Sequence, residues 1–330
     1  MSLIEEIRQK ASNLNKRVVL PEAERDIRVL KAAAMLSGMG LAKPILLGEK
    51  EKIENLAKEQ GVELPDSVEI KPYRNSVFDE KKFRYFEKKL AHKNPTKEQI
   101  QEISLNPLFT AGWMLDTGKA DAAVAGSVAS TGEVIVSALR TVGVAEGSEL
   151  VSSTFLMEMP DGKVFTYADC AVVPYPESDQ LASIALDAGD THRLLTGAEP
   201  LIAFLSFSTK GSAKHERVEL VQQAYQKAKA AKPNWKMDGE LQFDTAFVDS
   251  VAKRKAPDSE VGGNANVFIF PNLDAGNIAY KITERLAGAT ATGPILQGLS
   301  KPYMDLSRGC SVDDIVNTAC VASLISQKSS

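Results

Sequence analysis

The segment RVVLPEAERDIRVLKAAAMLSGMGLAKPILLG, from Arg17 to Gly48, decides the fold class of this chain. It begins with a short apolar strand that ends in a polar loop, and a helix follows from about Arg25. Ile27, Leu30 and Ala34 recur at helical spacing, and two glycines end the helix before a second apolar strand, PILLG. Strands that alternate with helices in this way predict a parallel sheet covered on both faces.

Two helices are expected between residues 79 and 117. The charge-rich run from Asp79 to Lys93 predicts an exposed helix, and its basic cluster is interpreted as a solvated face: Lys81, Lys82, Arg84, Lys88 and Lys89. Pro95 breaks the chain, and Thr96 with Gln99 begins a second helix that is expected to run to Thr117.

The pattern changes near Glu149. There, LVSSTFLMEM and KVFTYADCAVV flank Pro160-Asp161-Gly162 and predict an antiparallel β-hairpin. A hairpin that interrupts a β-α alternation marks a domain boundary. A long helix from Ser178 to about Thr196 follows, and then two apolar strands, LIAFLSF and NVFIFP, each lead into a polar loop.

The composition excludes several classes of protein. The 330 residues are 44% hydrophobic and 25% charged with a net charge of -4, so nothing draws the chain as a whole toward nucleic acid. No apolar run is long enough for a membrane span, and the N-terminus does not resemble a secretory signal, so we expect a cytoplasmic protein of about two domains. The cysteines and histidines are scattered, which predicts neither disulfides nor a metal site: Cys170, Cys310, Cys320, His92, His192 and His215.

The stretch DLSRGCSVDD, from Asp305 to Asp314, combines a hydroxyl, a guanidinium, a thiol and carboxylates just before an apolar helix. Ser311 is expected to cap that helix, with Asp314 as the acidic member of a capping box. A helix N-terminus beside Arg308 is a suitable seat for a phosphate. The alternative is that these residues only cap a helix and form a surface ion pair.

Two further loops carry polar groups after predicted strands. The loop Ser127 to Thr131 is rich in hydroxyls, and STKGSAK, from Ser208 to Lys214, resembles a phosphate cradle. Neither a Walker A motif nor a GxGxxG fingerprint is present, which disfavours a nicotinamide enzyme. The helix after NVFIFP carries Tyr280 and Lys281, which on spacing alone are equally ordinary helix-surface residues.

Taken together, five motifs resemble the phosphate acetyltransferases (phosphotransacetylases), in the same order and spacing: STKGSAK, DGELQFD, NVFIFPNLDAGNIAYK, GPILQGLSKP and DLSRGC. The resemblance extends over nearly the whole chain. It implies reversible acetyl transfer between acetyl phosphate and coenzyme A (CoA), with phosphate as the other product and no permanently bound cofactor. It also implies a homodimer. The composition, not the resemblance, is the reason that we expect neither a nucleic-acid nor a membrane partner.

The fold implied by the resemblance is α/β, with two three-layer α/β/α domains, mainly parallel sheets and an interdomain active-site cleft. We expect residues 1–148 plus 302–330 to form the N-terminal domain, which the C-terminal helix completes. Residues 149–301 are expected to form the second domain, with the β-hairpin as an insertion.

The LSRGC motif of the family implies a catalytic serine at Ser307, a phosphate-binding arginine at Arg308 and an acidic base at Asp314. An ordinary carboxyl is much more acidic than a thiol, so this base requires burial, or the thiol requires positive charge beside it. The transfer is expected to be direct attack by the CoA thiolate. Substrate binding is assigned to Ser127, Ser130, Thr131, Arg140, Ser208, Thr209, Lys210, Gly211, Ser212, Asn277, Tyr280 and Lys281.

The sequence departs from the family at two arginines associated with anionic substrates, whose positions hold Leu90 and Val136. Arg140 lies one helical turn beyond the second position and is expected to compensate there. Lys88, Lys89 and Lys93 are the candidates for the first.

Several alternatives remain. Cys310 is either a covalent acyl carrier with a lowered pKa, because it lies near Arg308 and a helix N-terminus, or a small packed side chain. The enzyme is either an acetyltransferase or a propionyl- or butyryltransferase of the same mechanism. The lost arginines also allow a non-catalytic module that binds acyl-CoA or acyl phosphate. A metal-dependent decarboxylating dehydrogenase has a related architecture, but the acidic metal cluster is not recognisable.

Overall fold

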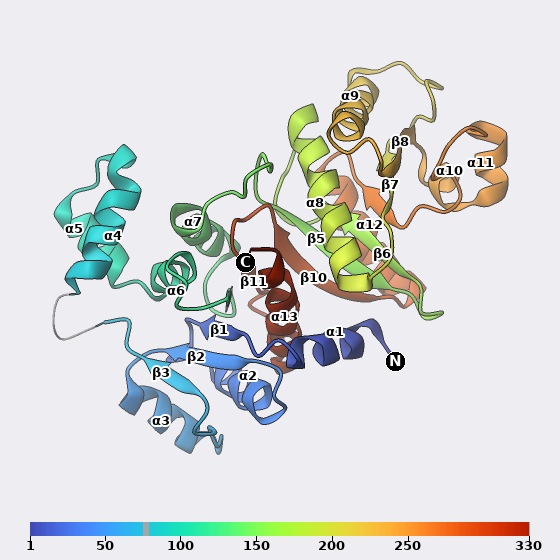
Figure 1. Ribbon diagram of the computed structural model, residues 1–330. Helices are drawn as coiled ribbons and strands as arrows, with labels where there is room; N and C mark the ends of the chain where they lie inside the picture. Colours follow the sequence, from blue (N-terminus) through green and yellow to red (C-terminus); the bar gives the residue numbers. More distant parts are fainter. Residues whose placement is uncertain (75–78, 330) are drawn as a thin grey trace. The chain divides into compact units, whose positions relative to one another are not determined.

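The computed structural model describes residues 1–74 and 79–329, and the chain divides into two compact units (Figure 1). The first unit comprises Leu3–Ala145 and Leu299–Ser330, and the second comprises Glu146–Gly298. Each unit contains one sheet with helices packed against it. Both units belong to the expected α/β class.

The sheet of the first unit is parallel throughout, as the alternating pattern predicts. Its strand order is β11-β4-β1-β2-β3. The strands are β1 (Arg17–Leu20), β2 (Lys43–Leu47), β3 (Glu69–Lys71), β4 (Ala122–Ala125) and β11 (Tyr303–Asp305). The last strand comes from the end of the chain and lies beside β4, so loops far apart in sequence follow neighbouring strands.

Helices cover both faces of this sheet. On one face α13 contacts α1, α2 and β4, whereas α6 and α7 contact each other and the strands β4 and β11 on the other face (Figure 1). The helices of these layers are α1 (Leu3–Ser12), α2 (Ile27–Gly38), α3 (Lys50–Glu59), α6 (Pro107–Asp116), α7 (Thr131–Thr141) and α13 (Val312–Ile325), which ends in the 3-10 turn η2 (Ser326–Ser329).

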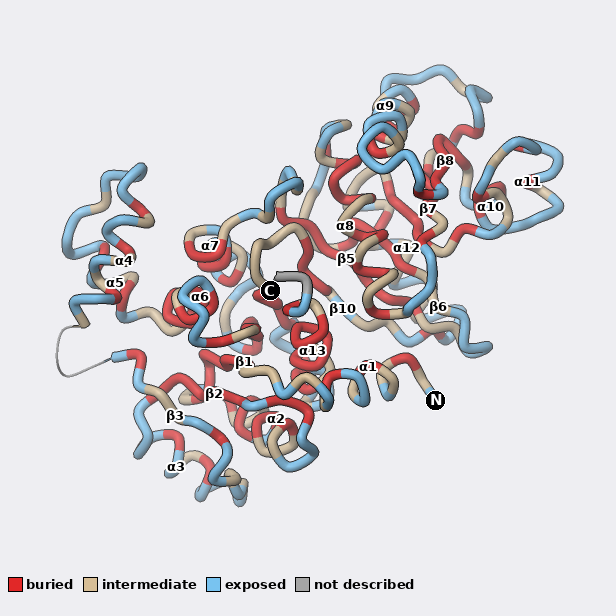
Figure 2. The backbone as a smooth tube through the Cα atoms, in the orientation of Figure 1, coloured by how far each residue is buried: buried red, intermediate tan, exposed pale blue. Residues whose placement is uncertain are grey.

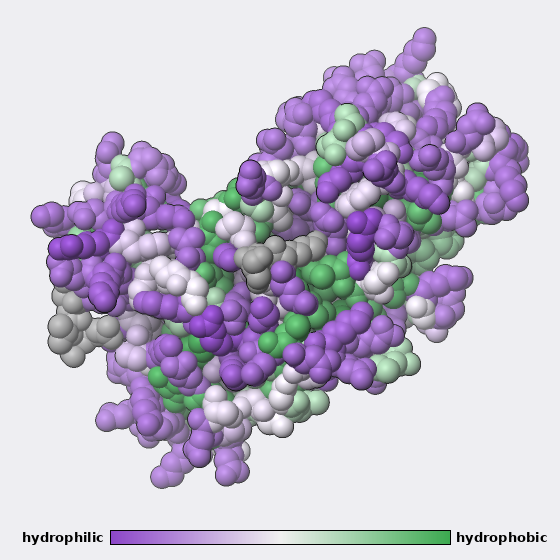
Figure 3. Space-filling view, in the orientation of Figure 1, coloured by the Kyte–Doolittle hydropathy of each residue, from purple (hydrophilic) through white to green (hydrophobic). Residues whose placement is uncertain are grey.

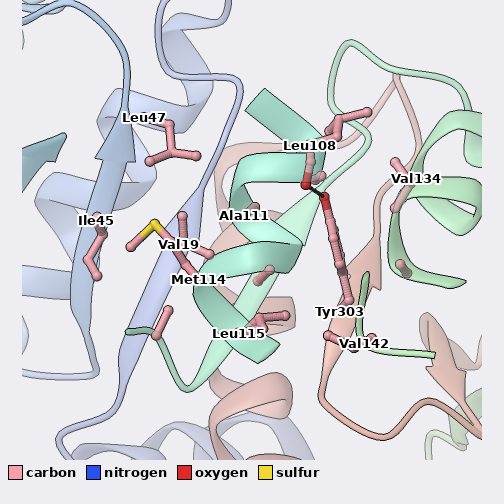
Figure 4. Close-up of a cluster of buried hydrophobic side chains, with 14 of the residues drawn as sticks. Val19, Ile45, Leu47, Leu108, Ala111, Met114, Leu115, Val134, Val142 and Tyr303 are labelled. Carbon is pink, nitrogen blue, oxygen red and sulfur yellow. Dashed lines mark hydrogen bonds between the residues drawn. The ribbon is translucent and has the colours of Figure 1, made fainter. Parts of the chain in front are cut away.

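Tyr303 anchors β11 in the core beneath α6 and α7. Its ring is fully buried among apolar side chains that include Val19 and Val134 (Figure 4). The hydroxyl donates a 3.0 Å hydrogen bond to the carbonyl oxygen of Leu108, so the only polar atom of this buried side chain is satisfied. The strand that leads into the DLSRGC stretch therefore has a fixed position, and all three of its residues are buried. The helix that follows this stretch, α13, is also drawn mainly as buried (Figure 2).

The expected helix from Thr96 to Thr117 is instead two helices, α5 (Lys97–Ser104) and α6. Asn106 caps α6 by accepting the N–H of Leu108 at 2.9 Å, and Pro107 is the first helical residue. Proline lacks an N–H and clashes with the preceding turn, so it begins a helix but does not continue one. The capping box of Thr96 and Gln99 is confirmed.

The predicted basic helix is α4 (Glu80–Leu90), followed by the 3-10 turn η1 (Ala91–Lys93). Its outer surface is hydrophilic (Figure 3), but the interpretation of Lys82 as solvated is wrong. Lys82 is buried and donates to the carbonyl oxygen of Tyr73 at 2.9 Å and to the hydroxyl of Thr110 at 3.3 Å. Burial lowers the pKa of this lysine to about 8.

The second unit has a mixed sheet of order β10-β5-β6-β9-β7-β8. β5 and β6 form the antiparallel hairpin expected from the sequence, and β10 pairs antiparallel with β5. The other pairs are parallel. The strands are β5 (Ser152–Glu158), β6 (Val164–Ala168), β7 (Leu201–Leu205), β8 (Lys236–Leu241), β9 (Val267–Ile269) and β10 (Thr290–Gln297).

Two groups of helices enclose this sheet. α8 (Ser178–Thr196) and α9 (Glu216–Ala231) pack on a buried cluster that includes Phe204 and Ile269. A separate cluster, which includes Phe268, lies against α10 (Phe243–Phe247) and α12 (Leu273–Ala287), and α11 (Asp249–Lys255) packs on α10. Neighbouring residues of β9 thus contribute to different clusters, as expected for a strand buried on both faces.

Candidate functional site

Two predicted loops of the first unit lie side by side because β4 and β11 are neighbours. Asp305, the last residue of β11, is paired with Ala125, the last residue of β4. Both strands run in the same direction, so the loops that follow them leave the same edge of the sheet. The structure therefore brings Ser127, Ser130 and Thr131 to the edge that carries Ser307 and Arg308.

Arg28 ties these two loops together. Its guanidinium donates to the carbonyl oxygens of Arg308 at 3.0 Å, Cys310 at 2.6 Å and Ser127 at 3.0 Å. Asp26 caps α2 and binds the same guanidinium through both carboxylate oxygens. Burial alone would raise the pKa of Asp26, but the hydrogen bonds from Arg28 hold it below its ordinary value. Sequence reasoning missed this pair.

Glu22 organises the loop after β4. Its carboxylate accepts the backbone N–H groups of Gly126, Ser127, Val128 and Ala129 at 2.6 to 3.1 Å. The hydroxyl of Ser127 donates to the same carboxylate at 3.0 Å. These donors, which would suit an external anion, are therefore already bound to a buried side chain that sequence reasoning also missed.

Two capped helices begin at this edge. Ser311 and Asp314 form the predicted capping box of α13: the Asp314 carboxylate accepts the Ser311 N–H at 2.8 Å. Ser130 and Glu133 form the same box on α7. The pKa of Glu133 is lowered by hydrogen bonds from Ser130, with further contributions from the charges of Arg25 and Arg308. The Arg308 side chain is thus electrostatically coupled to the start of α7.

The LSRGC loop contains both exposed and buried residues. Ser307, Arg308 and Gly309 are exposed, and the Gly309 N–H donates to the Ser307 hydroxyl at 3.2 Å. Asp314 is exposed too, so the burial required of a carboxylate base is not found there.

Cys310 is buried, and the lowered pKa expected of an acyl carrier is wrong. Burial raises the pKa of its thiol, and the nearby charge of Arg28 only partly opposes that effect. A buried thiol of raised pKa is a packed side chain, the reading favoured by its surroundings.

A cavity of about 490 Å³ opens where the strand order of the sheet reverses. The strand order runs outward from β1 through β2 to β3 and then returns to β4 on the other side of β1. Ligands bind at such switch points in open α/β sheets. The lining combines two arginines, Arg25 and Arg74, with apolar and aromatic groups such as Tyr73, Leu108 and Val128. Four carboxylates also line it: Glu22, Glu24, Glu102 and Glu133.

A second cavity of about 410 Å³ lies between α4, α5, α6 and α7. It is lined by Leu90, the position of one departure from the family, and also by Lys93 and Arg140. Two of the four residues named as candidates to compensate for the lost arginines, Lys93 and Arg140, therefore line one cavity, whereas Lys88 and Lys89 are not among its lining residues. Val136 is exposed on α7.

In the second unit, the STKGSAK loop follows β7 and ends directly before His215, the N-cap of α9, which begins at Glu216. Glu240 accepts the hydroxyl of Ser208 at 2.8 Å and the N–H of Gly211 at 2.7 Å. Burial would raise the pKa of Glu240, but hydrogen bonds from Gly211, Gln222 and Ser208 lower it. An internal carboxylate thus occupies the predicted cradle.

Thr209, Lys210 and Ser212 of this loop also have internal partners. The Thr209 N–H donates to the Ser212 hydroxyl at 3.0 Å, and the exposed Lys210 forms an ion pair with Asp238. On α12, Lys281 donates to Asn277 at 2.9 Å, and Asn277 donates to the carbonyl oxygen of Cys170 at 2.9 Å. Tyr280 stacks on Phe155 with ring centres 4.2 Å apart.

Among residues 1–74 and 79–329, no group of three or more His, Cys, Asp or Glu side chains is arranged to hold a metal ion. In the same part of the chain, no helix is both long and apolar enough to cross a membrane.

Comparisons with known proteins agree along the whole chain. The model of the family described as phosphate acetyl/butaryl transferase matches residues 2–323. The phosphate acetyltransferase of Acetivibrio thermocellus is 44% identical, with 99% of each chain covered. The phosphate acetyltransferase of Thermoanaerobacterium thermosaccharolyticum is 42% identical over 99% of this chain and 100% of its own. The crystal structure of a phosphotransacetylase from Streptococcus pyogenes superposes with a TM-score of 0.93 at 38% identity, covering 99% of this chain and 98% of the other.

Proposed function

The chain belongs to the phosphate acetyl/butaryl transferase family, and on that basis we propose that it transfers an acetyl group reversibly between acetyl phosphate and CoA. The observation that carries this proposal is the 44% identity to a phosphate acetyltransferase over 99% of both chains. The exposed SRG segment beside two helix N-termini is the site to which we assign the reaction. The substrates are CoA, acetyl phosphate, acetyl-CoA and phosphate. The proposed reaction uses no permanently bound cofactor.

In the proposed reaction the CoA thiolate attacks the acetyl carbonyl directly, and phosphate leaves. Arg308 binds the phosphoryl group, for which a planar guanidinium is well matched. Ser307 donates a hydrogen bond to the oxyanion that develops on the carbonyl, and removal of such a donor costs roughly 3 kcal/mol in known cases. The exposure of both residues supports these roles. Asp314 is the base by family resemblance, although its surroundings are those of a helix cap.

CoA also requires a site for its negatively charged nucleotide end. We assign this end to the cavity of about 410 Å³ that Lys93 and Arg140 line, because two cations there outnumber one carboxylate, Glu102. Ser127, Ser130 and Thr131 are assigned to the acyl phosphate side, next to the SRG segment. Ser127 acts mainly through the backbone conformation that Glu22 stabilises.

The second unit contributes the remaining proposed contacts, from Ser208 to Ser212 and from Asn277, Tyr280 and Lys281. The ammonium groups of Lys210 and Lys281 belong to exposed residues, which supports a role toward an anionic substrate. Each is engaged with a neighbouring side chain, Asp238 or Asn277, so binding exchanges one polar partner for another.

We further propose that the two compact units are the two domains of the enzyme and that it is a cytoplasmic homodimer. Three apolar side chains on α12, Ile278, Ile282 and Leu286, are 56%, 52% and 83% exposed. They are spaced four residues apart and form a stripe that a second copy is expected to cover. The three cysteines are free thiols, which suits a reducing compartment.

The test is the formation of thioester from CoA and acetyl, propionyl or butyryl phosphate, without added metal or nicotinamide. Acetyl phosphate is expected to give the highest kcat/KM. A higher kcat/KM with butyryl phosphate would show that the enzyme is a butyryltransferase. No turnover with any of the three acyl phosphates would show that the chain binds acyl ligands without transferring the acyl group.

A further inference from the structure

Glu22 is a buried acid whose carboxylate binds a single loop of the site. It lies two residues after the end of β1, and only 6% of its surface is exposed. Its Oε2 accepts the N–H groups of Gly126 and Ser127 at 2.8 Å and the Ser127 hydroxyl at 3.0 Å. Its Oε1 accepts the N–H groups of Val128 at 3.1 Å and Ala129 at 2.6 Å. Five donors from four consecutive residues thus converge on one carboxylate.

Consecutive N–H groups that converge in this way form a concave anion site. Here the anion is part of the protein, so Glu22 rather than a substrate fixes the conformation of the loop. The cavity of about 490 Å³ that Glu22, Val128 and Ala129 line has four carboxylates against two arginines, and the net negative charge disfavours an anionic substrate there. Arg308 is therefore the better place for a phosphoryl group.

The same loop packs closely on the end of β11. Gly126 has a φ of +103°, and a Cβ at that position would lie 2.7 Å from the backbone of Leu306, so only glycine fits. Burial raises the pKa of Asp305, the last residue of β11, to about 6, and the negative charge of Glu22 adds to this effect. The Glu22 carboxylate therefore lies near β11 as well as near the loop after β4.

Two routes lead from this loop to the proposed phosphoryl site. The loop runs directly into Ser130 and Thr131, at the start of α7. The carbonyl oxygen of Ser127 also accepts a 3.0 Å hydrogen bond from Arg28, whose guanidinium binds the carbonyl oxygen of Arg308 at 3.0 Å. A shift of the Ser127 carbonyl therefore moves Arg28 and, with it, the segment that carries Arg308.

We infer that Glu22 is a positioning residue for the phosphoryl site. By holding residues 126–129 it fixes the start of α7 and, through Arg28, the segment that carries Arg308. The inference rests on the proposed function, which assigns the phosphoryl group to Arg308. Glu22 contacts no reacting atom in this role and takes no part in proton transfer, which stays assigned to Asp314.

The substitution Glu22→Gln tests this role with little change in volume. An amide has one acceptor oxygen, and its NH2 group would face at least two N–H donors of the loop. Those donors lose their partner, so the loop is expected to shift although the side chain still fills its place. Glu22→Asp keeps the charge but is one methylene shorter, and it replaces Glu22→Gln if that variant does not fold.

The measurements are the Kd values for inorganic phosphate and for CoA, by calorimetry, and kcat/KM for acetyl phosphate. In Glu22→Gln the Kd for phosphate is expected to rise by roughly tenfold and kcat/KM to fall by roughly 10- to 100-fold, because a binding group is misplaced. The Kd for CoA is expected to stay within about twofold. Glu22 does not line the cavity that is assigned to the nucleotide end of CoA.

Asp121→Asn is the matched control. Asp121 also accepts a backbone N–H and a guanidinium, both from Arg17, but it precedes β4 at the amino end of the strand. This variant is expected to lose stability and to keep the wild-type Kd for phosphate and kcat/KM for acetyl phosphate.

Equal effects in Glu22→Gln and Asp121→Asn would show that Glu22 only stabilises the fold, and would overturn the inference. A Kd for phosphate that stays within about twofold in Glu22→Gln, or in Glu22→Asp where that variant is used, would overturn it as well. Failure of the proposed function is seen separately. A wild type that binds phosphate but forms no thioester would refute acetyl transfer, while the phosphate Kd would still test Glu22.

Discussion

The guanidinium of Arg28 donates a 2.6 Å hydrogen bond to the carbonyl oxygen of Cys310, 282 positions away in the chain. The same group binds the carbonyl oxygen of Arg308, so it holds the backbone on both sides of Gly309. Arg308, the residue proposed to bind the phosphoryl group, belongs to this segment. Its position therefore depends on Arg28.

Replacement of Arg28 by Ala or Lys tests this dependence. Misplacement of a binding group by about 1 Å can cost 100-fold in rate, so kcat is expected to fall by roughly 10- to 100-fold. Arg17→Ala is the matched control. Arg17 also binds a carboxylate, Asp121, through two guanidinium nitrogens, but it lies at the amino end of β1, whereas the site lies at the carboxyl ends of the strands. The control is expected to lower stability and leave kcat unchanged. Equal kcat losses in both variants would contradict a specific role for Arg28.

Replacement of Arg140 by Ala tests the assignment of the CoA cavity. Loss of one hydrogen bond to a charged group costs about 1.5 to 3 kcal/mol, so the Kd for CoA is expected to rise at least tenfold, measured by calorimetry. Lys81→Ala removes an exposed cation from α4 that does not line the cavity, and serves as the control. An unchanged Kd for CoA in Arg140→Ala would show that Arg140 does not replace the arginine that is missing at Val136.

Replacement of Cys310 by Ala separates direct transfer from an acyl-enzyme. The thiol is buried with a raised pKa, so kcat is expected to stay within about twofold and stability to fall by roughly 1 kcal/mol. Mass spectrometry of the wild type mixed with acetyl phosphate is expected to show no added acetyl group. A covalent adduct that disappears in the variant would refute direct transfer.

Asp305 makes stability depend on pH in a defined direction. Its pKa is near 3.8 in an unfolded chain and about 6 in the folded protein, so between these values the folded state binds more protons. The native state is favoured when Asp305 is protonated and loses this advantage as the pH rises through 6. The free energy of unfolding of Asp305→Asn minus that of the wild type is therefore expected to be higher at pH 7.5 than at pH 4, by on the order of 2 kcal/mol.

Urea unfolding at the two pH values measures this difference. Asp66→Asn, which changes an exposed carboxylate, controls for the general effect of a lost charge. A difference between Asp305→Asn and the wild type that does not vary with pH would show that the Asp305 carboxyl is ionised in the folded protein over the whole range.

The apolar stripe on α12 predicts the site of dimer contact. Ile282 lies at its centre, so Ile282→Glu is expected to convert a dimer into a monomer, measured by light scattering during gel filtration. Val248→Glu places the same charge at another exposed apolar position, 39% exposed, and is expected to remain dimeric. A monomeric wild type, or dissociation by both substitutions, would contradict this contact surface.

Local patterns made part of this structure predictable. The strands β1 and β2 are apolar runs separated by a helix, and their parallel pairing follows from that alternation. The capping box of Ser311 and Asp314 involves residues three positions apart, so four letters of sequence are sufficient to predict it.

The rest depends on contacts between distant segments. Glu22 binds the loop that begins 104 positions later in the sequence, and Arg28 binds the carbonyl oxygen of Arg308, 280 positions later. These contacts exist because β4 lies between β1 and β11 in the sheet, an order that no local pattern records. The burial of Lys82 has the same origin, since its partners Tyr73 and Thr110 belong to other segments.

Acetyl transfer at the SRG segment is tested by thioester formation from acetyl phosphate and CoA, with Arg308→Ala beside the wild type and Arg17→Ala as the control for folding. Turnover is expected from the wild type and from the control, and a loss of roughly 1,000-fold is expected in Arg308→Ala. No wild-type turnover, or an Arg308→Ala variant as active as the wild type, would refute acetyl transfer at this segment.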